Sequence, residues 1–363
     1  MPFDLKYMHT PGAFTWWYAD LVDEDGNGMV LIWFFGLPFF PSKSLEMAPD
    51  HLGGLTLSVY KEGKLDFYAF QTYPPEGLYV NLDQNNWCLG NSTITLRESA
   101  SQTHLQASLY INYAGAEKPL IADLEVKGVR RNSALSLLEN NATSHVWSPM
   151  MLCAQGQLSG TIAGQPFRIE GPSYMDRNQS LDSIQDLGIK DWHWARISMQ
   201  EKTWILYFLQ NHEDEWTQLA FSATPDGQMA QEYVQAFEQN KAIKDRYGIR
   251  WARTAQVELV NQKQPLELSL SAPLEHSPFY MRHMITAKQG DEKGHGVYER
   301  LVPRRIRLKW LQPLIAMRIN EWHRNRSMWL PLFEGTSNDR WTRLWRSLYQ
   351  TKKDSELHLG KVS

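Results

Sequence analysis

The sequence predicts a mainly β protein built from two consecutive antiparallel β lobes. Short segments rich in branched and aromatic residues recur along most of the chain, and Gly, Asn or Asp stands near many of the breaks between them. The chain has 363 residues, which is too long for one ordinary β-barrel and suits two domains. Many short strands at this spacing are typical of an all-β barrel or sandwich.

The first lobe begins with a predicted hairpin. Strands at Thr15–Leu21 and Met29–Phe35 are separated by a cluster of turn-forming residues at Asp23–Gly28. In Ser92–Arg97 apolar residues fall at every second position, as a half-buried strand requires. The remaining strands predicted here are Leu55–Tyr60, Leu65–Thr72 and His104–Tyr113.

The second lobe repeats this composition and adds one predicted helix. Trp192–Ser198 and Thr203–Leu209 flank a short turn and predict another hairpin. The helix is expected over Gln228–Ile243, where no Gly or Pro intrudes and an apolar stripe is approximated by Met229, Tyr233, Phe237 and Ile243. Further predicted strands are Gln256–Val260, Leu266–Ser271 and Met281–Ala287.

The chain divides by composition into three predicted parts. The polar, turn-like residues 179–190 place a lobe boundary near 185, so we expect domains at 1–185 and 186–300 and a basic, aromatic extension at 301–363. Large apolar residues separate the basic ones in this extension, which suits either contact with an anionic membrane surface or a helix packed across the barrels. Its basic residues are Arg304, Arg305, Arg307, Lys309, Arg318, Arg324 and Arg326.

Composition and missing motifs exclude several classes of function. The formal net charge of −3 gives no reason to expect nucleic acid, and Cys88 and Cys153 do not make a disulfide framework. We expect a cytoplasmic protein, because the first residues lack a secretory signal and no apolar run is long enough to cross a membrane. The Asn141-Ala142-Thr143 sequon carries little weight without such a signal. Nucleotide, zinc and serine-hydrolase motifs are absent, so we expect no metal.

Three short segments carry candidate site residues: His145-Val146-Trp147, Gly171–Asn178 and Asp191–Arg196. Taken alone they are weak, because an Asp after Gly171-Pro172 is ordinarily a turn or surface residue and a His beside Trp is ordinarily packed in a core. Strand alternation places Trp192 and Trp194 on one face. The chain has 15 Trp, and rings at this density suit either pockets for apolar ligands or a Trp-rich core.

These segments, taken in order, resemble the carotenoid 1,2-hydratase (hydroxyneurosporene synthase) family. Gly12–Asp20, which contains Trp17, looks like the family's N-terminal signature. The three segments above follow in the family's order and at about its spacing, and Ser277–Arg282 resembles a later family segment. The resemblance spans roughly residues 12 to 320.

The resemblance implies two consecutive lipocalin-like β domains and a cofactor-free hydro-lyase. The family adds water across the terminal 1,2 double bond of an acyclic carotenoid. Its functional positions fall on His145, Trp147, Tyr174 and Asp176. We add Trp17, Trp192 and Trp194 as candidates for binding the hydrophobic substrate, an acyclic carotenoid or similar polyene.

The proposed chemistry assigns a role to each catalytic candidate. An apolar pocket raises the pKa of a carboxyl by up to ~3–5 units, so Asp176 is expected to stay protonated and to donate the proton that starts hydration. The rings of Trp147 and Tyr174 would stabilise the tertiary carbocation, and His145 would orient water or accept its proton. Tyr174 could instead hold Asp176 in its protonated form.

One departure from the family leaves alternatives open. This chain has Gln179-Ser180 after Asn178, where the family usually has Trp-Gly. Two other functions therefore stay open: an enzyme of the same fold that cyclises another hydrophobic terpenoid by acid, and a lipid-binding protein without catalysis. Peripheral contact with the inner membrane surface also stays open.

Overall fold

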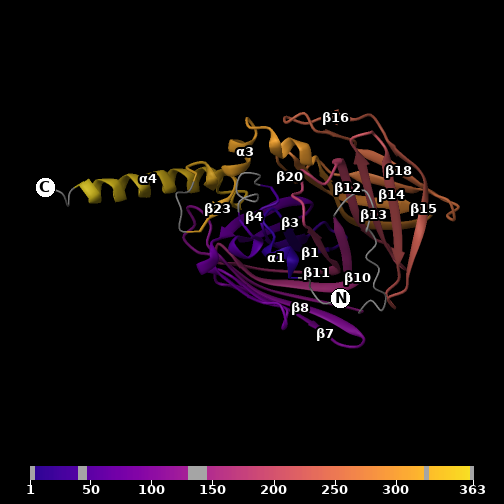
Figure 1. Cartoon of the computed structure of the whole chain (residues 1–363), viewed down its shortest axis with the longest axis horizontal. Helices are drawn as coiled ribbons and strands as arrows, with labels where there is room; N and C mark the ends of the chain where they lie inside the picture. The colour runs from indigo at the N-terminus through magenta and orange to yellow at the C-terminus, as the bar shows by residue number, and fades with distance from the viewer. Residues whose placement is uncertain (1–4, 40–46, 130–144, 323–326, 360–363) are drawn as a thin grey trace.

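The computed structural model describes residues 5–39, 47–129, 145–322 and 327–359, and it confirms a mainly β fold class (Figure 1). Each strand predicted above overlaps an observed strand. The Asn141-Ala142-Thr143 sequon and the residues Arg324 and Arg326 lie outside the described residues.

The first lobe is an open, half-barrel sheet of consecutive antiparallel strands. The strand order is β4-β3-β2-β1-β11-β10-β9-β8-β7-β6-β5, so the first and last long strands of the lobe, β1 and β11, pair at its centre. The strands are β1 (Phe14–Val22), β2 (Gly28–Phe35), β3 (Gly53–Lys61), β4 (Lys64–Tyr73), β5 (Leu78–Asn81), β6 (Asn86–Leu89), β7 (Ser92–Glu98), β8 (Gln102–Ile111), β9 (Leu120–Val129), β10 (Val146–Ile162) and β11 (Gln165–Ser180).

The second lobe closes into an eight-stranded antiparallel barrel. Its path runs β12-β13-β14-β15-β18-β19-β21-β22, and β22 returns to β12. The strands are β12 (Ile189–Ser198), β13 (Thr203–Asn211), β14 (Trp216–Ala223), β15 (Met229–Gln239), β18 (Thr254–Leu259), β19 (Leu266–Leu270), β21 (Tyr280–Gln289) and β22 (Glu292–Leu301), with short strands β16 (Ile243–Lys244), β17 (Arg250–Trp251) and β20 (Glu275–His276).

The predicted helix over Gln228–Ile243 is wrong, because this segment is largely strand β15, which pairs with β14 and β18. Met229, Tyr233 and Phe237 are four residues apart. That spacing suits one helix face, but it equally suits one strand face, since four is a multiple of two. The tertiary pairing with two neighbouring strands therefore decided the structure of this segment.

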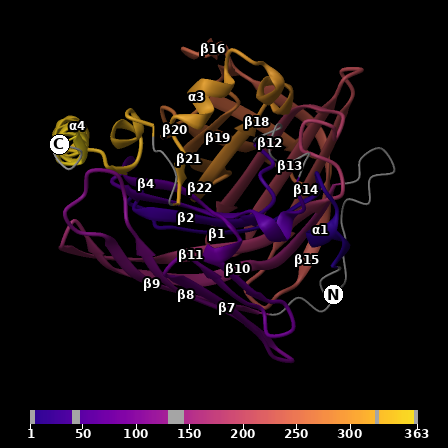
Figure 2. The same ribbon diagram turned by 60° about the vertical axis from the view of Figure 1, so that its left-hand side comes forward.

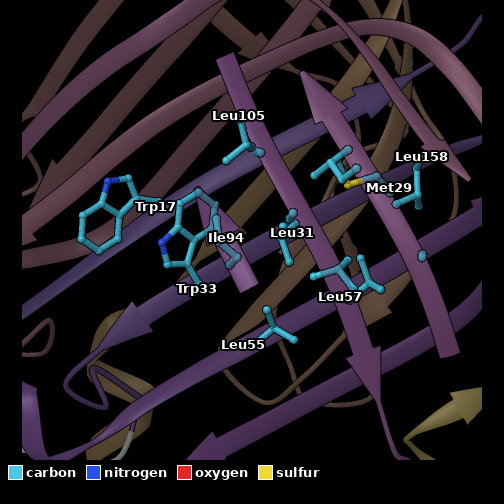
Figure 3. Packing of buried hydrophobic residues seen from close by; sticks show 14 of the residues in the cluster. Trp17, Met29, Leu31, Trp33, Leu55, Leu57, Ile94, Leu105 and Leu158 are labelled. Carbon is cyan, nitrogen blue, oxygen red and sulfur yellow. The ribbon is translucent and has the colours of Figure 1, made fainter. Parts of the chain in front are cut away.

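The two lobes pack face to face, and each keeps a core of its own. Figure 3 shows the core of the first lobe, where Trp17, Leu31 and Leu57 lie among other apolar side chains. The barrel interior is filled by residues such as Leu206 and Phe208. A third cluster contains side chains of both lobes, including Tyr174 of β11, so it lies between the half-barrel and the barrel.

The C-terminal segment returns to the first lobe after the barrel is complete (Figure 2). Strands β23 and β24 both pair with β4, at the end of the half-barrel sheet. Glu334 is fully buried beside them and accepts hydrogen bonds from Gln71 Nε2 at 2.9 Å and from the Ala114 amide at 3.0 Å. The elements here are η3 (Pro303–Arg307), α3 (Gln312–Ala316), β23 (Asn320–Glu321), η4 (Leu330–Leu332), β24 (Gly335–Thr336) and α4 (Arg340–Leu359).

Several basic residues of this segment bond to the protein itself. Arg305 donates to the Pro278 carbonyl, and Arg307 forms an ion pair with Asp186. The buried residue Ile306 packs in the cluster between the lobes. This part of the extension therefore packs across the fold, as one of the two interpretations expected. The domain limits at 185 and 300 stay a prediction; β11 ends at 180 and β12 begins at 189.

Candidate active site

Asp176 lies near the C-terminal end of β11, so the segment Gly171-Pro172 does not form the turn that its composition predicts. Its neighbours across the sheet are Tyr18 of β1 and Pro149 of β10. Because directly opposed residues point to the same face, Asp176 and Tyr18 both face the barrel. Asp176 therefore lies between the two lobes.

Three side chains donate hydrogen bonds to the Asp176 carboxyl group. Trp147 Nε1 and the Tyr174 hydroxyl donate to Oδ2 at 2.7 and 2.8 Å. Asn178 Nδ2 lies 2.9 Å from Oδ1. Alternation along β11 places residues 174, 176 and 178 on one face, and Trp147 is the β10 residue opposite Asn178. Strand geometry alone thus assembles the carboxyl and its three donors.

The environment of Asp176 favours its protonated form. Burial raises the pKa of this carboxyl to about 7, while the bonds from Trp147 and Tyr174 act in the opposite direction. The negative charges of Glu299 and Asp20 add to the increase. Desolvation therefore outweighs three donors that would each stabilise the anion. A substantial fraction of Asp176 is consequently available as an acid near neutral pH.

Asp176 opens into a cavity of about 80 Å³ with a mostly aromatic wall. The half-barrel and the barrel both contribute to this wall, as expected for a space between them. The lining residues are Trp16, Tyr18, Ile32, Phe34, Phe39, Trp147, Asp176, Asn178, Trp192, Trp194, Tyr207, Tyr280, Glu299 and Leu301.

His145 is buried beside this cavity but is not one of its lining residues. Its Nδ1 lies 3.1 Å from the Tyr207 hydroxyl, and its ring packs edge-on against Trp192 with centroids 4.9 Å apart. Burial lowers the pKa of His145 to about 3, with Asn178 partly opposing this effect. The imidazole is therefore neutral at physiological pH. Its position suits holding Tyr207 and Asn178 in place better than touching a substrate.

Four of the expected residues lie around Asp176, namely Trp147, Tyr174, Trp192 and Trp194, whereas Trp17 lies elsewhere. Trp192 and Trp194 line the cavity, on one strand face as alternation predicts. Trp17 points to the opposite face of β1, where it stacks on Trp33 in the first-lobe core (Figure 3). The expectation that Trp17 contacts substrate is therefore corrected. The cavity-lining residue at this point of β1 is its neighbour Trp16.

Glu299 is a second carboxyl in the cavity wall, and the sequence gives no local signal for it. It lies on β22 directly opposite Trp194, and Arg282 Nε of β21 donates to Glu299 Oε1 at 2.7 Å. Burial raises the pKa of Glu299, while the Arg282 charge lowers it. The cavity thus holds two carboxyl groups in different surroundings: Asp176 has only uncharged donors, whereas Glu299 is paired with a cation.

A fully buried ion pair connects the lobes next to the site. Arg196 of β12 donates to Asp20 of β1, and neither side chain is exposed. Arg196 lies on the same strand face as Trp192 and Trp194, which accounts for the Trp-x-Trp-x-Arg spacing. Losing either partner of such a pair is strongly destabilising, because it leaves an uncompensated buried charge. The pair therefore links β12 of the barrel to β1 of the first lobe beside the site.

No cluster of three or more His, Cys, Asp or Glu side chains capable of holding a metal ion occurs within the described parts of the chain. Both cysteines, Cys88 and Cys153, are free thiols.

Comparison with known proteins places these features in a family. The model of the carotenoid hydratase CrtC family matches residues 68–328. The acyclic carotenoid 1,2-hydratase of Thiocapsa roseopersicina is 24% identical over 331 residues, which is 87% of this chain and 75% of that protein. The protein of the same name from Cereibacter sphaeroides is 23% identical over 257 residues, 68% of this chain and 86% of its own.

A solved structure described as a candidate AttH protein from Nitrosomonas europaea has the same fold. Its TM-score is 0.53 at 15% identity, and the match covers 79% of this chain and 92% of that chain. At this identity the likeness concerns the fold alone. The family match, by contrast, spans most of the chain. Asp176, its three donors and Glu299 all lie within the matched residues. The chain therefore belongs to the carotenoid hydratase CrtC family.

Proposed function

We propose that this chain adds water across the terminal double bond of an acyclic carotenoid or a similar long polyene, with Asp176 as the acid. Family membership makes the chain a hydratase of the carotenoid type, a hydro-lyase. The single observation that carries the mechanism is a buried carboxyl with a pKa of about 7 that opens into an aromatic cavity. A protein that only carried lipid would have no need for such a group.

The first step is a proton transfer from Asp176 to one alkene carbon. A new C–H bond takes the π electron pair, Asp176 becomes a carboxylate, and the other alkene carbon becomes a tertiary carbocation. Trp147 Nε1 and the Tyr174 hydroxyl already donate to the oxygen Oδ2, so they stabilise the carboxylate as its charge appears. Aromatic rings in the wall stabilise the cation by about 2 kcal/mol or more for each desolvated contact.

The second step is attack by water, and the proposed acceptor of its proton is Glu299 in the cavity wall. The water oxygen supplies the electron pair of the new C–O bond, and the excess proton passes to the Glu299 carboxylate. Burial raises the pKa of Glu299, but its ion pair with Arg282 opposes this effect, while Asp176 has no cationic partner in its wall. The two carboxyls therefore suit opposite roles, base and acid. Proton exchange with solvent then restores both groups, and no cofactor takes part in the proposed reaction.

We propose that the protein contacts a membrane surface through α4. Trp341, Trp345 and Tyr349 follow one another at four-residue spacing and are 66, 67 and 73% exposed. The first turns of α4 contact the first lobe, and the rest of the helix extends away from the fold (Figure 1). Exposed Trp and Tyr on a basic segment suit the interface of an anionic membrane, where an apolar substrate would be held. No helix in the described ranges is long and apolar enough to span a bilayer.

The proposed function is tested by incubating the protein with lycopene or neurosporene in detergent. The expected product is heavier by one water. Asp176→Asn should abolish this product while the circular dichroism spectrum stays unchanged, and Asp83→Asn, which alters an exposed carboxyl, should leave turnover intact. Wild-type turnover in Asp176→Asn would refute the acid assignment. A bound polyene recovered as an isomer without added water would instead indicate acid-triggered cyclisation.

A further inference from the structure

A second, larger cavity adjoins the acid cavity, which is the cavity into which Asp176 opens. Its volume is about 260 Å³, and it shares the wall residues Ile32, Phe39 and Tyr280 with the first. The acid cavity alone, at about 80 Å³, is smaller than the roughly 300–1,000 Å³ of ordinary ligand pockets. A long chain whose end reached Asp176 would therefore extend past these three residues into the second cavity.

The second cavity has one apolar wall. Strand β4 contributes Leu65 and Phe70, and the C-terminal segment contributes Ile315 and Ile319. All four side chains belong to the cluster between the lobes or pack against it. This wall suits a hydrocarbon chain, because burying apolar surface needs no specific partner groups.

Three guanidinium groups also line the second cavity, and they distinguish it from a simple hydrocarbon site. They belong to Arg246, Arg318 and Arg340. In the described ranges none of the three forms an ion pair with a carboxylate. The fourth arginine of the wall, Arg282, has its charge balanced by Glu275 and Glu299. The cavity therefore has an excess of positive charge.

Arg246 and Arg318 both contact the ring of Tyr247. Their guanidinium carbons lie 5.1 and 5.8 Å from the centre of the same ring, that of Tyr247. Arg318 also packs over Phe333 at 4.6 Å, and its Nη2 donates to the Tyr247 hydroxyl at 2.6 Å. Burial lowers the pKa of Arg318, and the charge of Arg246 acts in the same direction. Two like charges beside apolar surface are unfavourable until an anion joins them.

We infer that the second cavity binds an anionic group, a carboxylate or a phosphate, carried on an apolar chain. Guanidinium groups recognise both anions through paired hydrogen bonds, and Arg246, Arg318 and Arg340 line one cavity together with the apolar residues of the C-terminal segment. The chain would run along the apolar wall toward Asp176. This last point rests on the proposed function, whereas the binding of the anionic group does not depend on catalysis.

Binding of two matched probes to the full-length protein tests the inference. Oleate and oleyl alcohol share one chain and differ in charge. Calorimetry should give oleate at least about tenfold tighter binding, because charge-assisted bonds are about twice as strong as neutral ones. Arg246→Gln should remove most of this preference and leave oleyl alcohol binding unchanged. Arg246 is exposed, so this variant should fold, and Arg97→Gln on β7 is the charge-matched control.

Two outcomes would overturn the inference. The first is equal affinity for oleate and oleyl alcohol, or an oleate affinity that Arg246→Gln does not change. In the second, free oleate fails to bind, and Arg246→Gln weakens binding to phosphatidylglycerol vesicles but not to phosphatidylcholine vesicles. The arginines would then bind lipid headgroups outside the cavity. Selective oleate binding without any hydration activity would refute the proposed function alone.

Discussion

Replacing Asp176 with asparagine should make the protein more stable at alkaline pH, and this gain should disappear in acid. The carboxyl has an ordinary pKa of 3.8 and a pKa of about 7 in the folded protein. Between these values the folded state retains a proton that the unfolded chain has lost. The free energy of unfolding of the wild type therefore falls as pH rises through this window. Asparagine does not titrate, so the variant avoids this loss.

The size of the effect follows from the shift in pKa. At about 1.36 kcal/mol per unit, a change from 3.8 to about 7 amounts to about 4 kcal/mol at pH 8. This is an upper value, because the neutral amide replaces a carboxyl whose bonds with Trp147 and Tyr174 are already in place. Even half of it would move the melting temperature by several degrees.

Differential scanning calorimetry of both proteins from pH 4 to pH 9 measures this difference. The melting temperature of the variant minus that of the wild type should rise between pH 4 and pH 7 and then level off. Asp83→Asn, at an exposed carboxyl, is the control for a general effect of charge. A difference that stays constant with pH would mean that Asp176 is ionised throughout this range in the folded protein, and the acid mechanism would be untenable.

Three further predictions concern the hydrogen bond from Trp147, the proposed base Glu299 and the proposed membrane contact of α4. Trp147→Phe removes the 2.7 Å hydrogen bond to Asp176, which is worth about 1.5–3 kcal/mol. The pKa of Asp176 should therefore rise by about 1–2 units, and the alkaline limb of the pH–rate profile should shift upward by the same amount. An alkaline limb at the same pH as in the wild type would contradict this role of Trp147. Glu299→Gln should lower kcat by about 10²–10⁴ with substrate binding unchanged, and full activity would exclude it as the base. Trp345→Ser should reduce sedimentation with phosphatidylglycerol vesicles, whereas Trp216→Ser on the barrel should not; equal effects would argue against α4 as the contact.

The strands of both lobes could be predicted because most of them are buried on one face at least and bounded by turn residues. The choice of face could not always be predicted. Strand β1 is buried on both faces, so no polar alternation distinguishes Trp16 from Trp17. The rings of these two neighbours therefore looked equivalent in sequence, although one lines the cavity and the other fills the first-lobe core.

The family pattern pointed to Asp176 as the candidate acid, whereas most of the residues around it could not be predicted. Asn178 stands two residues from Asp176 on the same strand face, and that spacing was the available signal for it. Glu299 and Tyr207 come from the barrel and reach the cavity only because the lobes pack face to face. Local sequence carries no information on which outer face of a barrel will meet another lobe.

The pairing of β23 and β24 with β4 has a consequence for how the chain is made. Gln71 on β4 and Glu334 beside β24 are 263 residues apart and hydrogen-bonded to each other. At about 5–20 residues per second, a ribosome needs roughly 13–50 s to synthesise the intervening chain. During that time the rest of the half-barrel and the whole barrel are synthesised, and the edge of β4 still has no partner from the C-terminal segment. The first lobe to be synthesised is thus the last to be finished, and until then its open edge at β4 can pair with another chain.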